Sequence, residues 1–366
     1  MSPQDRDHRG DSGARRRHRL VAEGTVPWAD ASLAGVAVAA ALGTALLAGA
    51  GPSATLVATG AFFACLSDGP GPWRRRIGGM VAATVAVGVV ATATAAVGST
   101  LVLYVLVVAV VALALGLTTL RRPRIAQVLT SALMAAIVFA HVGEAVPAWR
   151  IGTLLIAGGF AAAALTAAGG LLRSATRNVH TSDSVPGAPA SGPTAGIRRD
   201  TVVFALLFTV LVVALTAVAD LSRLTDMWWV PMTFAAILRP HPSVTLKRAS
   251  GQFVGALAAA LPAGLILVTL QPPPLAVLPL VLICVVGARR YLGTHNALGA
   301  FFLTLFILAA LDLGGQLHSD SAGLRIVAIM IGGAVAVVFA AIWTLLTARA
   351  RAHPRVELPT AGAATR

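Results

Sequence analysis

Long apolar stretches dominate this chain, and arginine lies on one side of almost every one of them. A helix needs about 20 residues to cross the hydrocarbon core of a bilayer. With 57% apolar and 11% charged residues and a mean hydropathy of +0.82, the chain lies far outside the range of soluble domains. We therefore predict an all-α polytopic membrane protein with about twelve transmembrane helices. The stretches lie near residues 31–50, 53–67, 77–97, 100–120, 125–143, 151–172, 201–219, 226–239, 250–270, 274–288, 295–311 and 323–347.

The distribution of charge between the stretches predicts the topology. Basic residues that flank membrane spans are retained on the cytoplasmic side. Of the 28 Lys and Arg, all but Arg150, Arg223 and Arg325 fall on one side of the predicted spans. We therefore expect a multi-pass protein of the bacterial inner membrane with both termini and the central linker in the cytoplasm.

The same topology explains the net charge of +14, because no basic cluster lies on a soluble module or among stacking aromatic residues, as nucleic-acid binding would require. The expected partners are the lipid bilayer and a small organic anion, with a homo-oligomer left open and no nucleic acid. Cys65 and Cys284 fall within predicted spans, and we expect no disulfide, metal or cofactor. Phosphate-binding and nucleophile motifs are missing, so the sequence does not predict an enzyme.

The chain divides into two similar halves. Residues 174–200 are rich in Ser, Pro and Gly and are typical of a flexible linker. Residues 69–76 align with 241–248, and Arg121–Arg122 align with Arg289–Arg290. An even number of helices in each half makes the two repeats parallel. The predicted regions are a cytoplasmic tail (1–29), a six-helix repeat (30–173), the cytoplasmic linker (174–200), a second six-helix repeat (201–348) and a second cytoplasmic tail (349–366).

Small residues and one proline predict how the helices pack. In lipid the hydrophobic effect contributes little between helices, so bundles rely on close approach at glycine. We expect this role for the pairs Gly78–Gly79, Gly158–Gly159, Gly251 with Gly255, and Gly332–Gly333. Pro262 removes a hydrogen bond inside its helix and should kink it.

One segment of the second half resembles a known family. It reads Trp228-Trp229-Val-Pro231-Met-Thr233, then Arg239-Pro240, then Thr245-Leu-Lys247-Arg248 with Gly251 and Gly255 following. This is similar to the repeat signature of the fusaric acid resistance family, also called the aromatic acid exporters. Residues 61–63, 68–72 and 74–76 carry a weaker version in the first half.

The resemblance covers roughly residues 30–350 and implies proton-driven export of small, often aromatic, organic acids across the inner membrane. The better-studied members carry a large soluble domain, where this chain has only a short linker. Plant malate channels resemble one such membrane half and work as dimers. A dimeric passive anion channel therefore stays open as an alternative, as does a membrane protein of the envelope that transports nothing.

Several residues are candidates for the substrate pathway. An anion needs positive charge or helix N-terminal amides within an apolar path. Basic and imidazole groups lie in and after the Arg-Pro turn, and a polar pair opens the eleventh stretch. An indole could stack on an aromatic substrate or lie at the membrane interface. The candidates are Arg239, His241, Lys247, Arg248, His295, Asn296 and Trp229. For each basic or polar group the alternative is a topological or capping role.

Two acids are candidates for proton coupling. The alignment of the halves matches Glu144 with Asp312, at the outer ends of the fifth and eleventh stretches. His141 lies one turn before Glu144 and could pair with it. The alternative for all three is a solvated loop position. For Asp68, beside Arg74–Arg76, we expect an internal salt bridge that fixes the turn.

Overall fold

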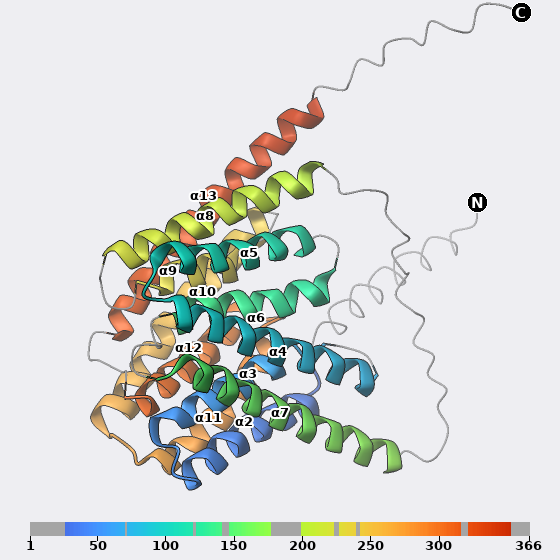
Figure 1. The fold of residues 1–366 in the computed structure, drawn as a ribbon, viewed down its shortest axis with the longest axis vertical. Helices are drawn as coiled ribbons and strands as arrows, with labels where there is room; N and C mark the ends of the chain where they lie inside the picture. The colour runs from blue at the N-terminus through green and yellow to red at the C-terminus, as the bar shows by residue number, and fades with distance from the viewer. Residues whose placement is uncertain are drawn as a thin grey trace, which may run out of the picture.

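The structure is a computed structural model that describes residues 26–69, 72–119, 122–140, 146–176, 199–222, 227–238, 242–315 and 321–352. All regular segments among these residues are helical (Figure 1). We call α2 to α7 the first half and α8 to α13 the second half. The first half contains α2 (Trp28–Leu47), α3 (Ala54–Leu66), α4 (Trp73–Val97), α5 (Leu101–Thr119), α6 (Pro123–Phe139) and α7 (Ala148–Thr176). The second contains α8 (Arg199–Ser222), α9 (Trp229–Ile237), α10 (Pro242–Ala263), α11 (Leu278–Tyr291), α12 (Asn296–Leu313) and α13 (Ser321–Ala352).

The helix lengths confirm the all-helical membrane class but not the number of spans. Within the described ranges, nine helices are long and apolar enough to cross a bilayer. The helix α3 has 13 residues and α9 has 9. At 1.5 Å per residue they reach about 20 Å and about 14 Å, short of the roughly 30 Å of a hydrocarbon core. Twelve transmembrane helices therefore remain a prediction.

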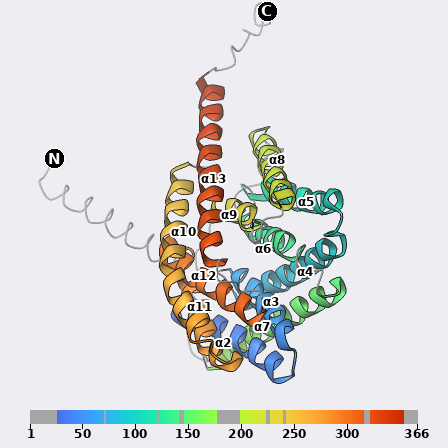
Figure 2. The ribbon, with the colours of Figure 1, turned by 90° about the vertical axis from the view of Figure 1, so that its left-hand side faces the viewer.

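The first helix of each half packs against the opposite half. The helix α2 lies along α11, and α8 lies along α5 (Figures 1 and 2). One buried apolar cluster joins α2 and α3 to α11 and α12. A second joins α5 and α6 to α8, α9 and α13. Neither half thus completes its core without helices from the other.

The short helices α3 and α9 are held by glycines on the last helix of their own half. A Cβ at Gly158 of α7 would lie 1.9 Å from the carbonyl oxygen of Val57 in α3. A Cβ at Gly332 of α13 would lie 2.7 Å from the carbonyl oxygen of Val230 in α9. The expected packing role is confirmed at both positions. Packing does not explain Gly78, because no atom lies within 4 Å of the position its Cβ would take.

Pro262 marks a change of helical hydrogen bonding, as expected. The helix α10 contains Pro262 one residue before its end and is followed by a π-helical segment at Gly264–Thr269. Proline has no N–H to donate, so the regular ladder cannot continue through it. π-Helical turns accommodate such interruptions within a helical segment.

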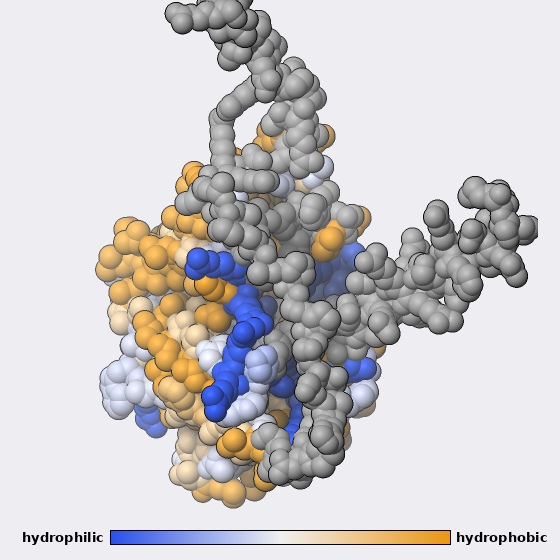
Figure 3. Space-filling model, turned by 90° about the vertical axis from the view of Figure 1, so that its right-hand side faces the viewer, coloured by the Kyte–Doolittle hydropathy of each residue, from blue (hydrophilic) through white to orange (hydrophobic). Residues whose placement is uncertain are grey.

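The helices α4 and α6 begin, and α5 and α7 end, at the same end of the bundle (Figure 1). The described basic residues at or beside these helix ends are Arg74–Arg76, Arg122, Arg124 and Arg173. Figure 3 faces this end and shows hydrophilic residues running between hydrophobic patches. Elsewhere, large apolar side chains are exposed on the outside of the bundle, as at Val102 (75% exposed) and Leu261 (80% exposed). An apolar outer surface with a basic end is typical of a membrane bundle.

The contact between α3 and α7 can be tested by adding a single methyl group. We expect Gly158→Ala to destabilise the protein by about 1–3 kcal/mol, because overpacked interiors cost that much and the neighbouring atom is a backbone oxygen that cannot move aside. Thermal unfolding of detergent-purified protein measures the change. Gly78→Ala is the matched control and should not lower the melting temperature, because alanine favours a helix at a position with open space. Equal melting temperatures for the two variants would refute the close contact.

Candidate functional site

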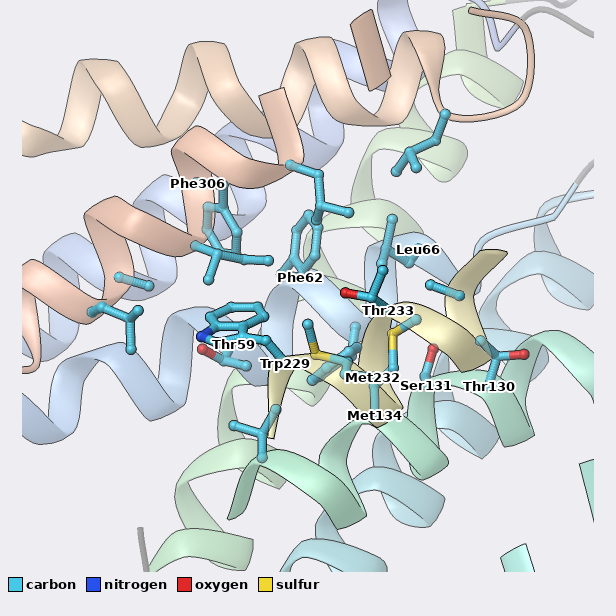
Figure 4. Close-up of a pocket in the computed structure, with 18 of the residues that line it drawn as sticks. Thr59, Phe62, Leu66, Thr130, Ser131, Met134, Trp229, Met232, Thr233 and Phe306 are labelled. Atoms are coloured by element: carbon cyan, nitrogen blue, oxygen red, sulfur yellow. The ribbon is translucent and has the colours of Figure 1, made fainter. Parts of the chain in front are cut away.

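A cavity of about 520 Å³ lies between the two halves. It follows α6 from Gln127 to Phe139 and α12 from Asn296 to Leu311, close to the full length of both helices. The short helices α3 and α9 form its other walls (Figure 4). The cavity therefore extends across much of the bundle at the seam between the halves.

The middle of the cavity is aromatic and apolar. Phe62 of α3 stacks on Phe306 of α12 with ring centroids 4.3 Å apart and planes 29° apart, so the two halves each contribute one ring. Trp229 of α9 is 1% exposed and stacks on Trp228 at 4.0 Å. Met134 and several aliphatic side chains complete this region (Figure 4). Such a wall suits a guest with a flat apolar body.

One end of the cavity is basic. Arg248 of α10 and Arg289 and Arg290 of α11 line it, and among the described lining residues there is no Asp or Glu. The hydroxyls of Thr59 and Thr130 donate hydrogen bonds to carbonyls of their own helices at 2.7 and 2.8 Å, so those protons are not offered to a guest. The arginines are the charged donors to an anion in the cavity, beside neutral donors such as Gln127, Gln252 and Asn296.

An ion network beside this end holds the first half together. Arg76 donates from Nε and Nη2 to the two carboxylate oxygens of Asp68 at 2.7 and 2.6 Å. Its Nη1 reaches Asp30 at 3.0 Å, and Arg173 reaches the same carboxylate at 2.5 Å. The internal salt bridge expected for Asp68 is confirmed.

The same network extends to the second half through α11. Nη2 of Arg289 lies 3.4 Å from the Asp68 carboxylate and also donates to the Asp68 carbonyl oxygen. Arg290 donates to the carbonyl oxygen of Val26 and lies 5.2 Å from the Trp28 ring centroid. Asp68 is therefore a shared acceptor that links arginines from both halves.

Arg248 is in a different electrostatic situation. Its one recorded bond is from Nη1 to the carbonyl oxygen of Ala236 at 3.3 Å. In the described part of the chain no carboxylate forms an ion pair with it. A partly buried arginine without a counter-ion leaves its charge available to an anionic guest.

The structure brings three of the predicted pathway residues to the cavity. Trp229, Arg248 and Asn296 line it, and Trp229 is 1% exposed. Lys247 and His295 are exposed and lie outside the lining. Arg239 and His241 fall outside the described residues.

Of the three predicted coupling residues, the structure describes only Asp312. Asp312 is half-buried in the last turn of α12, between the lining residues Leu311 and Gly314. Glu144 and His141 fall outside the described residues. The role of all three stays a prediction.

Sequence reasoning missed the stacked pair and the site of Arg289. Phe62 belongs to the weak motif of the first half, but no pattern links it to Phe306, which lies more than 200 positions away. The pattern of basic residues assigned Arg289 and Arg290 to the cytoplasmic side of the membrane and did not predict that they line the cavity. Their alignment with Arg121–Arg122 was the only available signal.

These features define a polytopic helical membrane protein with an amphipathic cavity between its halves. The profile of the fusaric acid resistance protein-like family matches residues 197–339. The second half therefore resembles this family, and the resemblance inferred from its motif is confirmed for these residues. Curated proteins and solved structures gave no match. The match covers less than half of the chain.

The ion network predicts unequal roles for its two acids. We expect Asp68→Asn to lower stability by about 3–5 kcal/mol, because losing one partner of a buried pair leaves charges uncompensated and Asp68 serves Arg76 and Arg289 together. Asp30→Asn should cost less, since Asp30 contacts only arginines of the first half that are partly exposed. Thermal unfolding of both variants in one detergent checks the order. A larger loss for Asp30→Asn would contradict this assignment.

Proposed function

We propose that the protein exports small organic acids, aromatic ones among them, across the bacterial inner membrane in exchange for protons. The observation that carries the proposal is the cavity between the halves, which combines an aromatic middle with an arginine-lined end. An organic anion needs both features, because its carboxylate seeks charge-assisted donors and its body seeks apolar contacts. The family match supports transport as the broad activity.

The direction follows from the expected topology. Basic residues next to spans stay in the cytoplasm, so the end of the cavity at Arg248 and Arg289 is the cytoplasmic one, and both termini lie on that side. A cytoplasmic anion meets the positive field of this end first. It then moves along α6 and α12 toward the opposite end, near Pro52 and Gly314.

The two-repeat organisation is part of the proposal. Its support is the matched packing of α2 with α11 and of α8 with α5, together with the short helices α3 and α9 in corresponding places. Parallel repeats related by an axis along the membrane normal have their shared site at the repeat interface. The cavity occupies that interface.

A passive anion channel is the second candidate. One observation favours it: the described lining residues include three arginines and no acid that could carry a proton. The measurement that separates the two is uptake of radiolabelled benzoate into proteoliposomes, with and without an imposed pH gradient. Accumulation above equilibrium that requires the gradient supports the exporter. Flux that stops at equilibrium and follows voltage supports the channel, and no flux of any organic anion would refute both.

Arg248 should contribute directly to anion binding. We expect Arg248→Gln to raise the KM for benzoate about tenfold or more, because a hydrogen bond to a charged group contributes about 1.5–3 kcal/mol and tenfold corresponds to about 1.4 kcal/mol. Lys247→Gln is the matched control, since Lys247 is the neighbouring cation but is exposed and outside the lining. Equal KM values for both variants would remove Arg248 from the pathway.

Asp312 is the described candidate for proton coupling. We expect Asp312→Asn to abolish gradient-driven accumulation while flux toward equilibrium persists, because the amide cannot release a proton but has nearly the same shape. Counterflow of labelled benzoate measures the second quantity under the same conditions. Accumulation at the original level would exclude Asp312 and leave the untested Glu144 as the candidate.

A further inference from the structure

We propose that a substrate carboxylate binds Arg289 by displacing Asp68, so that occupancy of the cavity breaks the ion contact between the halves. This inference rests on the proposed function and assigns a binding residue and a coupling role within it. Arg289 lies on α11 of the second half, and Asp68 follows α3 of the first. Arg76 and Arg289 share the carboxylate of Asp68.

The carboxylate of Asp68 is bound tightly by Arg76 and only weakly by Arg289, which holds Asp68 mainly through its carbonyl oxygen. Arg76 presents its Nε and Nη2 edge to the carboxylate at 2.7 and 2.6 Å, which is the bidentate geometry that arginine and carboxylate favour. Nη2 of Arg289 lies 3.4 Å from the same group, beyond a good charge-assisted hydrogen bond. Asp68 thus keeps a full partner when Arg289 leaves it.

Arg289 has an unused donor on the edge that a carboxylate would take. Its Nε is buried and has no hydrogen-bond partner, while its side chain is 14% exposed and lines the cavity. A buried donor without an acceptor is costly. A carboxylate in the cavity would accept from Nε and Nη2 together, as Asp68 does from Arg76, and would thereby compete with Asp68 for Nη2.

The consequence is a link between binding and the contact of the halves. With the cavity empty, Arg289 joins α11 to the segment after α3 through both the carboxylate and the carbonyl of Asp68. With an anion bound, Nε and Nη2 of Arg289 donate to the guest in place of the Asp68 carboxylate. Substrate binding therefore loosens the basic end of the seam, which a transport cycle requires if the halves move relative to each other.

The first test measures binding of benzoate to the purified full chain by calorimetry, with benzamide as the neutral probe of the same shape. We expect benzoate to bind at least tenfold more tightly than benzamide. Arg289→Gln should lose most of that preference. Arg75→Gln is the matched control, because Arg75 is exposed at the same end and does not line the cavity, and it should bind like the unaltered protein.

A second variant separates binding from folding. Arg289→Lys keeps the positive charge near Asp68 but cannot offer two donors from one planar edge. We expect it to retain the melting temperature of the unaltered protein while its affinity for benzoate falls about tenfold. A variant that kept both properties would overturn the assignment of the guanidinium edge.

Displacement of Asp68 has its own readout. Asp68→Asn removes the competing charge but keeps an oxygen that can accept from Arg76. We expect benzoate to bind the folded fraction of this variant more tightly than the unaltered protein, by about threefold or more, although the variant melts earlier. Unchanged or weaker binding would show that Asp68 and the guest do not compete.

The outcomes distinguish the inference from the function on which it rests. If the unaltered protein transports benzoate but Arg289→Gln binds it normally, the inference fails and the transporter stands. If benzoate and benzamide bind equally, Arg289 is no anion site and the inference again fails alone. If the unaltered protein neither binds nor moves any organic anion, both fail.

Discussion

The exchange of first helices between the halves is the constraint on which the rest of the structure depends. Because α2 packs on α11 and α8 packs on α5, each apolar cluster contains helices from both halves. The exchange also brings the basic end of α11 over Asp68 and Val26 of the first half. The ion network and the cavity therefore both lie at the contact between the halves, and a change in one should affect the other.

The seam between the halves is aromatic in its middle and ionic at its basic end. Its middle is closed by Phe62 and Phe306, which come from opposite halves and hold each other by stacking. Its basic end depends on largely buried ionic contacts, in which Arg76 and Arg289 share the carboxylate of Asp68. Aromatic stacking needs only shape and area, whereas the ionic end responds to charge. A guest with an apolar body and a carboxylate can contact the aromatic middle and the basic end at once. This is the physical basis for the proposed substrate class.

The sequence predicted whatever depends on local pattern. Apolar length predicted the helices, and the proximity of Asp68 to Arg74–Arg76 predicted a salt bridge that the structure contains. The Trp-rich motif predicted the family of the second half. Long-range pairing could not be predicted, because neither the stacking of Phe62 on Phe306 nor the contact of Arg289 with Asp68 leaves a periodic trace. The length of α9 could not be predicted either, because an apolar run does not show where a helix begins and ends, and α9 has 9 residues.

The two halves differ in what their aligned arginines contact. The sequence alignment sets Arg76 opposite Arg248, each near the start of the third helix of its half. Arg76 is neutralised by Asp68 and Asp30 and holds the first half together. The alignment sets Pro240 opposite Asp68, so the second half has no acid at that position, and Arg248 is left facing the cavity with only a carbonyl as its recorded partner. A carboxylate in one half and its absence at the aligned position of the other thus leave one arginine paired within the protein and the other available to a guest, so the cavity has a single basic end.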